Sequence, residues 1–135
     1  MVLFSESHQV DIKTDILLVN SYGEALKFYN ISKYVFLGKS LSKALMNNSG
    51  QNPIEPARLG CKIFHGPYIS NFIETYDYLK KLGVSKMINN SDELSISLVE
   101  EFKEDKAKNQ EIASKIEKYG ENIFNNVVTE LKKYI

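Results

Sequence analysis

Short runs of apolar residues alternate along this chain with stretches of helical spacing, and this alternation limits the possible folds more than any other feature. Four of the runs, at residues 15–19, 34–37, 61–65 and 84–88, are expected to be buried strands. Strands separated by helices need crossover connections, which favour parallel pairing, and their continuous apolar character suits a sheet covered on both faces. The sequence therefore predicts an α/β fold in which a Rossmann-like parallel sheet is flanked by helices, over residues 15–102.

Helical stretches are expected between and after these strands, at residues 22–32, 53–59, 71–82 and 91–102. Residues 103–135 are expected to form a C-terminal helical segment, because their apolar side chains recur every three or four positions, as one buried helical face requires. These positions are Ile112, Ile116, Tyr119, Ile123, Val127 and Leu131. Residues 1–14 are expected to be a mobile start, and the length of 135 residues suits a single domain.

Composition excludes several classes of protein and site. Seventeen basic residues balance seventeen acidic ones, so the chain has no general attraction to nucleic acid. The single cysteine, Cys61, cannot form an intrachain disulfide and lies in an apolar run, so we expect it to be a core residue in a reducing compartment. No run approaches the roughly 20 apolar residues of a membrane helix, and no signal peptide begins the chain, which predicts a cytoplasmic protein. No cluster has metal-ligand spacing, and no P-loop or Ser-His-Asp order is present.

The loops that follow the strands are the expected place for a ligand, because parallel sheets bind ligands beyond their carboxyl ends. All three prolines and four of the seven glycines lie between Gly38 and Pro67, which indicates loops of defined shape. The triplet Gly38-Lys39-Ser40 directly follows the run 34–37, where its backbone, cation and hydroxyl could contact a phosphate or a sugar acid.

Two helix starts carry the same Asn-x-x-Glu pattern, at Asn52 to Glu55 and at Asn71 to Glu74. Each pattern predicts either a capping box, with Asn as N-cap and Glu three residues later, or a ligand site in which the carboxylate accepts hydrogen bonds from a ribose. Both interpretations stay open. His65, at the end of a strand, is expected to be structural rather than catalytic, and the charged run 100–108 is expected to be a solvated helix face and connector.

Three segments resemble a known family, the Kdo (3-deoxy-D-manno-octulosonic acid) transferases of lipopolysaccharide synthesis. They read YVFLGKSL at 34–41, GQNPIEPARLG at 50–60 and FHGPYISNF at 64–72. The family shows FVGGSL, GGHNPLEPAALGKPV and FGPHxxNF in the same order. Upstream, NSYGE at 20–24 resembles the family's DTxGEL, and the whole resemblance covers residues 16–102.

The resemblance implies a glycosyltransferase of the GT-B type, built from two Rossmann-like domains, of which this chain is most of the second. It implies transfer of Kdo from the donor CMP-Kdo to a lipid A precursor at the cytoplasmic face of the inner membrane, without a metal or another cofactor. The positions that would bind CMP-Kdo or CMP are Gly38, Lys39, Ser40, Gln51, Asn52, Glu55, Gly66, Pro67 and Asn71. Glu55 would hold the ribose, and Gly23 and Glu24 would flank the cleft.

The chain departs from the family pattern at Lys39, where the family has Gly, and at Gln51 and Tyr68, where it has His. The N-terminal domain, with the acceptor surface and the general base, has no counterpart here, nor do the first strand-helix units of the second domain. We therefore expect no catalytic residue and no activity from the isolated chain. The alternatives are a non-catalytic remnant or interaction module, which could form a homo-oligomer through an exposed sheet edge, or a domain of another sugar-nucleotide transferase.

Overall fold

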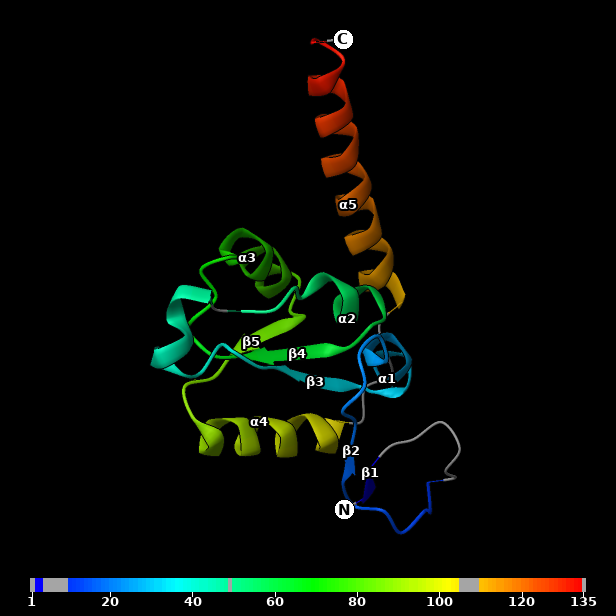
Figure 1. The fold of residues 1–135 in the computed structure, drawn as a ribbon, viewed down its shortest axis with the longest axis vertical. Coiled ribbons are helices and arrows are strands. Elements are labelled where there is room, and N and C mark those ends of the chain that lie inside the picture. Colours follow the sequence, from blue (N-terminus) through cyan, green and yellow to red (C-terminus); the bar gives the residue numbers. More distant parts are fainter. Residues whose placement is uncertain (1, 4–9, 49, 105–109, 135) are drawn as a thin grey trace.

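The computed structural model describes residues 2–3, 10–48, 50–104 and 110–134, whose elements are shown in Figure 1. In chain order these are β1 (Val2–Leu3), β2 (Leu17–Leu18), α1 (Ala25–Ile31), β3 (Tyr34–Leu37), the 3-10 helix η1 (Lys43–Asn48), α2 (Ile54–Arg58), β4 (Lys62–His65), α3 (Ile73–Lys81), β5 (Ser85–Met87), α4 (Ser91–Glu104) and α5 (Gln110–Leu131). The strands β3, β4 and β5 form one parallel sheet in that order. The predicted parallel sheet with flanking helices and a long C-terminal helix is confirmed.

The first predicted strand does not join this sheet. Only Leu17 and Leu18 of the segment 15–19 are strand, and they pair in parallel with Val2 and Leu3 as a separate two-stranded sheet. The prediction of one four-stranded sheet is therefore wrong. Consecutive strands need not be neighbours in a doubly wound sheet, because the order of the strands reverses at a switch point. Strand β1 also lies within the segment 1–14 that we expected to be a mobile start.

Helices cover both faces of the three-stranded sheet, with α2 and α3 on one side and α4 on the other (Figure 1). Alternate residues of the central strand face the two sides. Ile63 joins the core formed with α2 and α3, and His65 packs its ring on α3, whereas Lys62 reaches α4. The core comprises the buried side chains of Leu37, Ala57, Ile63, Tyr76, Leu79, Val84 and Ile116. Cys61 is also buried, as expected, with its Sγ 3.2 Å from the carbonyl oxygens of Tyr29 and Ser32.

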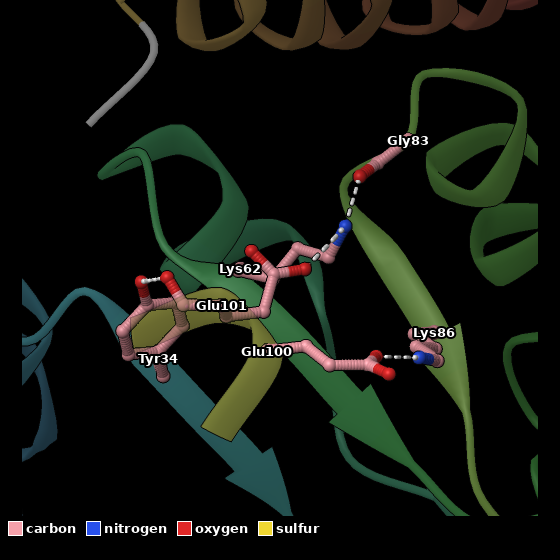
Figure 2. Close-up of polar contacts among 6 residues, drawn as sticks. All are labelled: Tyr34, Lys62, Gly83, Lys86, Glu100 and Glu101. Atoms are coloured by element: carbon pink, nitrogen blue, oxygen red, sulfur yellow. Dashed lines mark hydrogen bonds and ion pairs between the residues drawn. The ribbon is translucent and has the colours of Figure 1, made fainter. Parts of the chain in front are cut away.

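Charged side chains fasten α4 to one face of the sheet, at the start of β4 and at the middle of β5, and Figure 2 shows these contacts. Lys62 Nζ of β4 lies 3.4 Å from Glu101 Oε1, and Lys86 Nζ of β5 lies 3.7 Å from Glu100 Oε2. The Tyr34 hydroxyl of β3 donates to the Glu101 carbonyl oxygen at 2.9 Å. Glu101 is therefore not part of a solvated face, which corrects the interpretation of the run 100–108; residues 105–108 lie outside the described residues.

The long helix α5 packs on the body of the protein only over its first half. Ile116 is 1% exposed, and the Tyr119 ring stacks on Tyr78 of α3 with centroids 4.0 Å apart. Beyond this point the helix projects away from the sheet (Figure 1), and its remaining apolar residues Ile123, Phe124, Val127 and Leu131 are exposed. The single buried face that we predicted thus ends near Tyr119, because no described element covers the rest. Within the described residues, no helix combines the length and apolar character needed to cross a bilayer.

Candidate functional site

The loops that follow β3 and β4 meet at the carboxyl end of the sheet, where Ser40 joins them. Its Oγ donates to the Leu37 carbonyl oxygen at 2.6 Å and accepts from the Gly66 backbone N–H at 2.9 Å. Its own carbonyl oxygen accepts from the Tyr68 backbone N–H at 2.9 Å. Because Ser40 is fully buried and its hydroxyl is satisfied within the protein, it contributes to this edge by fixing the backbone of the two loops.

Gly66 is the point of closest approach between these loops. A Cβ atom added at Gly66 would lie 2.2 Å from the carbonyl oxygen of Ser40, so only glycine fits this position. Pro67 follows with an exposed side chain. The structure therefore brings Gly38, Ser40, Gly66 and Pro67 into one compact unit.

Lys39 lies at the tip of the first loop in a left-handed conformation, with φ of 58°. Left-handed backbone favours glycine, and holding another residue there costs on the order of 1 kcal/mol. The family pattern that this loop resembles has Gly at this position, and glycine adopts a φ of this sign readily. The Lys39 side chain is exposed, and no ion pair involves it among the described residues. This cation is free to meet an anion from solvent.

The segment before α2 is the third part of the same edge. The Gly50 backbone N–H donates to the Lys39 carbonyl oxygen at 3.1 Å, which brings the exposed Gln51 and Asn52 beside the loop 38–40. The Asn52 side-chain oxygen accepts from the Ile54 backbone N–H at 3.0 Å. The segment that carries these amide groups is thus joined through its backbone to the loop that carries the exposed Lys39.

The capping boxes that we predicted are not formed. Helix α2 begins one residue later than expected, with Pro53 as N-cap, so the Asn52 side chain lies outside the helix and accepts from the N–H of Ile54, its first residue. Helix α3 has Phe72 as N-cap and no side-chain cap, which leaves Asn71 exposed two residues before the helix. At α2 the Asn52 oxygen accepts from the N–H two residues further on, which closes a shorter turn than the bond to the third residue that a capping box requires.

Glu55 is exposed in the first turn of α2, and no hydrogen bond or ion pair to its side chain occurs among the described residues. Burial, and after it the charge of Glu55, raises the pKa of Tyr29. The Glu55 carboxylate is exposed and does not cap the helix, which leaves the ribose interpretation of Glu55 open and removes the capping interpretation.

His65 is buried at the end of β4, and it belongs to a buried group that the sequence did not reveal. It is 4% exposed, its Nδ1 lies 2.8 Å from the Gly66 carbonyl oxygen, and its ring packs on Tyr76 with centroids 4.2 Å apart. Tyr76, which we did not single out, donates its hydroxyl to the Gln51 carbonyl oxygen at 3.1 Å. The signal for Tyr76 was its spacing of three residues from Leu79, which puts both on the inner face of α3.

Gly23 and Glu24 belong to the start of α1. Gly23 has φ of 85°, and Glu24 is the N-cap and lies 2.8 Å from Lys27 Nζ. The same Glu24 oxygen has no hydrogen bond of acceptable angle, so the contact with Lys27 is an ion pair of poor hydrogen-bond geometry. Among the described residues, no group of His, Cys, Asp and Glu side chains could hold a metal ion.

Comparisons with known proteins agree with this geometry. No family model matches the chain. The chain is 27% identical over 97 residues to a 3-deoxy-D-manno-octulosonic acid transferase of Aquifex aeolicus, and 33% identical over 82 residues to the transferase of that name from Haemophilus influenzae. These matches include 72% and 60% of this chain but span only 26% and 18% of the relatives' own lengths.

A solved structure shares the fold. The C-terminal CMP-Kdo binding domain of WaaA from Acinetobacter baumannii superimposes with a TM-score of 0.61 at 21% identity, over 76% of this chain and 51% of that one. Together with the motifs around Gly38, Asn52 and Gly66, these similarities confirm that the chain resembles the C-terminal part of Kdo transferases.

Proposed function

We propose that this chain is the donor-binding part of a Kdo transferase, and that CMP-Kdo or CMP binds at the carboxyl end of the sheet. The observation that carries the proposal is the meeting of the three motif segments at one edge. Hydrogen bonds from Gly66 to Ser40, from Tyr68 to Ser40 and from Gly50 to Lys39 join the segments there. Residues as distant in sequence as Ser40 and Tyr68 thus meet at this edge.

In this proposal each exposed polar group has a distinct partner on the ligand. Lys39 meets the phosphate or the Kdo carboxylate, both of which are anionic. The amide side chains of Gln51 and Asn52, with Asn71 on the neighbouring loop, contact the nucleotide. Glu55 accepts hydrogen bonds from the ribose diol, and Gly38, beside which there is open space, allows the ligand to approach the backbone closely. The buried Ser40 and the adjoining Pro67 fix the shape of this surface.

Transfer to an acceptor needs more than donor binding. A general base must take the proton of the acceptor hydroxyl, and it must lie within hydrogen-bond reach of that group. None of the described polar residues at this edge has a position that assigns it this role. We propose that the base and the surface for a lipid A precursor belong to the part of the transferases that this chain does not span, at the cytoplasmic face of the inner membrane, and that the chain alone is inactive.

The test is an NMR titration of the isotope-labelled chain with CMP, with UMP as the control ligand. We expect chemical-shift changes that cluster at 38–40, 50–55 and 66–71 and that are larger for CMP. Preference for UMP would favour another sugar-nucleotide transferase. No change at millimolar CMP would contradict the proposal.

A matched pair of variants separates the role of Glu55 from a general effect of charge. Glu55→Gln removes the carboxylate at the proposed ribose contact, and we expect the Kd for CMP to rise several-fold. Glu74→Gln makes the same change in the first turn of α3, and we expect no change in Kd. Equal effects of the two substitutions would remove Glu55 from the site.

One observation favours a second, subordinate proposal of self-association. Within the described residues β3 pairs only with β4, so its other edge has no strand partner, and Phe36 on this strand is 39% exposed. Unpaired edges can pair with another chain. Sedimentation velocity over a range of concentrations tests this, and a monomer at all concentrations would contradict it.

A further inference from the structure

A buried polar chain runs beneath the proposed site and connects its three loops. It begins where the Ser40 hydroxyl accepts from Gly66 N–H, and it continues from the Gly66 carbonyl oxygen to Nδ1 of His65 at 2.8 Å. The His65 ring packs on Tyr76, whose hydroxyl reaches the Gln51 carbonyl oxygen at 3.1 Å. Side chains at 40, 65 and 76 thus connect the loop after β3, the loop after β4 and the segment before α2.

The direction of each hydrogen bond in this chain is fixed by its partner. A carbonyl oxygen can only accept, so His65 must carry its proton on Nδ1 to bond Gly66, and Tyr76 must donate to Gln51. Burial lowers the pKa of His65, and burial raises the pKa of Tyr76, so both side chains are neutral. A neutral chain with satisfied ends costs no buried charge and holds one arrangement of the loops.

We propose that His65 and Tyr76 are positioning residues of this site, which hold Gln51 and Asn52 at the nucleotide without touching it. The inference rests on the proposed function, because it assigns these residues a purpose at the same donor site. His65 is 4% exposed and Tyr76 is 1% exposed, so neither reaches the ligand directly. Gln51 and Asn52 are exposed and lie just before the short helix α2. A loop held in advance loses less conformational freedom when the ligand binds, and affinity is higher for that reason.

The variant that tests the inference is Tyr76→Phe. It keeps the ring against His65 and removes only the hydroxyl that donates to Gln51. We expect the Kd for CMP to rise about fivefold, and the amide protons of Gln51 and Asn52 to exchange faster with solvent. A merely structural role would lower the melting temperature and leave both of these readouts unchanged.

Tyr78→Phe is the matched control. It makes the same substitution on the same helix, where the hydroxyl donates to the Lys115 carbonyl oxygen of α5 at 3.5 Å and the ring stacks on Tyr119. We expect this variant to bind CMP as the unchanged chain does, with unchanged exchange at Gln51 and Asn52.

The outcomes distinguish failure of the positioning role from failure of the proposed donor-binding function. If the unchanged chain binds CMP and Tyr76→Phe binds it equally well, the positioning role is overturned. If the unchanged chain does not bind CMP, the proposed function fails. Amide exchange then decides the inference alone: faster exchange at Gln51 and Asn52 in Tyr76→Phe supports the connection, and unchanged exchange overturns it.

Discussion

The two ends of the three-stranded sheet use charge in opposite ways. At the amino end, Lys62 of β4 pairs with Glu101 of α4, and Lys86 in the middle of β5 pairs with Glu100 of the same helix. At the carboxyl end, Lys39 is exposed and has no ion pair among the described residues.

The contacts that hold the backbone in place also differ between the two ends of the sheet. The amino end is fastened by side chains from a separate helix, whereas the carboxyl end is fastened by bonds among its own loops, with Ser40 buried between them. Tight backbone packing beneath exposed polar side chains is the arrangement that the proposed binding site needs, because the loops are held by their own hydrogen bonds and Lys39 has no ion pair among the described residues. At the other end the lysines and glutamates are paired with each other, so they stabilise the fold and are not available to bind a ligand.

Gly66→Ala should have the largest effect on stability, because it disrupts the close packing of the two loops at the carboxyl end. The new Cβ would meet the Ser40 carbonyl oxygen at 2.2 Å, so the loops must separate, and we expect a loss of about 3 kcal/mol in the free energy of unfolding. Gly38→Ala on the neighbouring loop meets nothing within 4 Å and should change it by less than about 1 kcal/mol. Urea denaturation measures both, and similar losses would show that the two loops are not packed as described.

Glu101→Gln should have an intermediate effect, at the amino end alone. The pair with Lys62 is partly buried, with side-chain exposures of 19% and 27%, and we expect a loss of about 1 kcal/mol that shrinks at high salt. Glu117→Gln breaks the exposed pair with Arg58 and should cost under about 0.5 kcal/mol. Neither variant should alter the Kd for CMP. A higher Kd for CMP in Glu101→Gln would contradict the claim that only the carboxyl end of the sheet takes part in binding.

Lys39→Gly should have a small effect on stability. It should stabilise the fold slightly and weaken the binding of CMP. Glycine relieves the left-handed backbone at φ of 58°, so we expect the free energy of unfolding to rise by about 0.5 kcal/mol. Loss of the cation should raise the Kd for CMP several-fold, and Lys39→Arg should retain affinity. Thermal unfolding and the CMP titration measure the two quantities, and unchanged affinity in Lys39→Gly would remove this cation from the site.

The strands of the main sheet and the loops at its carboxyl end could be predicted from the sequence, because local signals determined them. The apolar runs at 34–37, 61–65 and 84–88 located the three strands of the main sheet, and the motifs around Asn52 and Gly66 located the loops at its carboxyl end. These signals depend on periodicity and on turn residues, which act over a few positions.

The features that the sequence did not reveal depend on distant contacts or on small shifts of backbone. The chain through His65 and Tyr76 joins residues from three elements, and no spacing along the sequence indicates such a connection. The pairing of Glu101 with Lys62 also depends on how α4 crosses the sheet. At Asn52 a shift of one residue in the start of α2 was enough to replace the predicted capping box with a different hydrogen bond.

The uneven covering of α5 divides one continuous helix into two parts that unfold separately. Its first part, with Ile116 buried and Tyr119 stacked, opens only when the body of the protein opens. Past Gly120, every described residue through Leu131 except the half-buried Val128 is exposed, and this isolated length of helix is too short to be stable in water by itself. Gly120, a weak helix former, stands at the boundary, so the end of the helix frays and re-forms while the sheet stays intact.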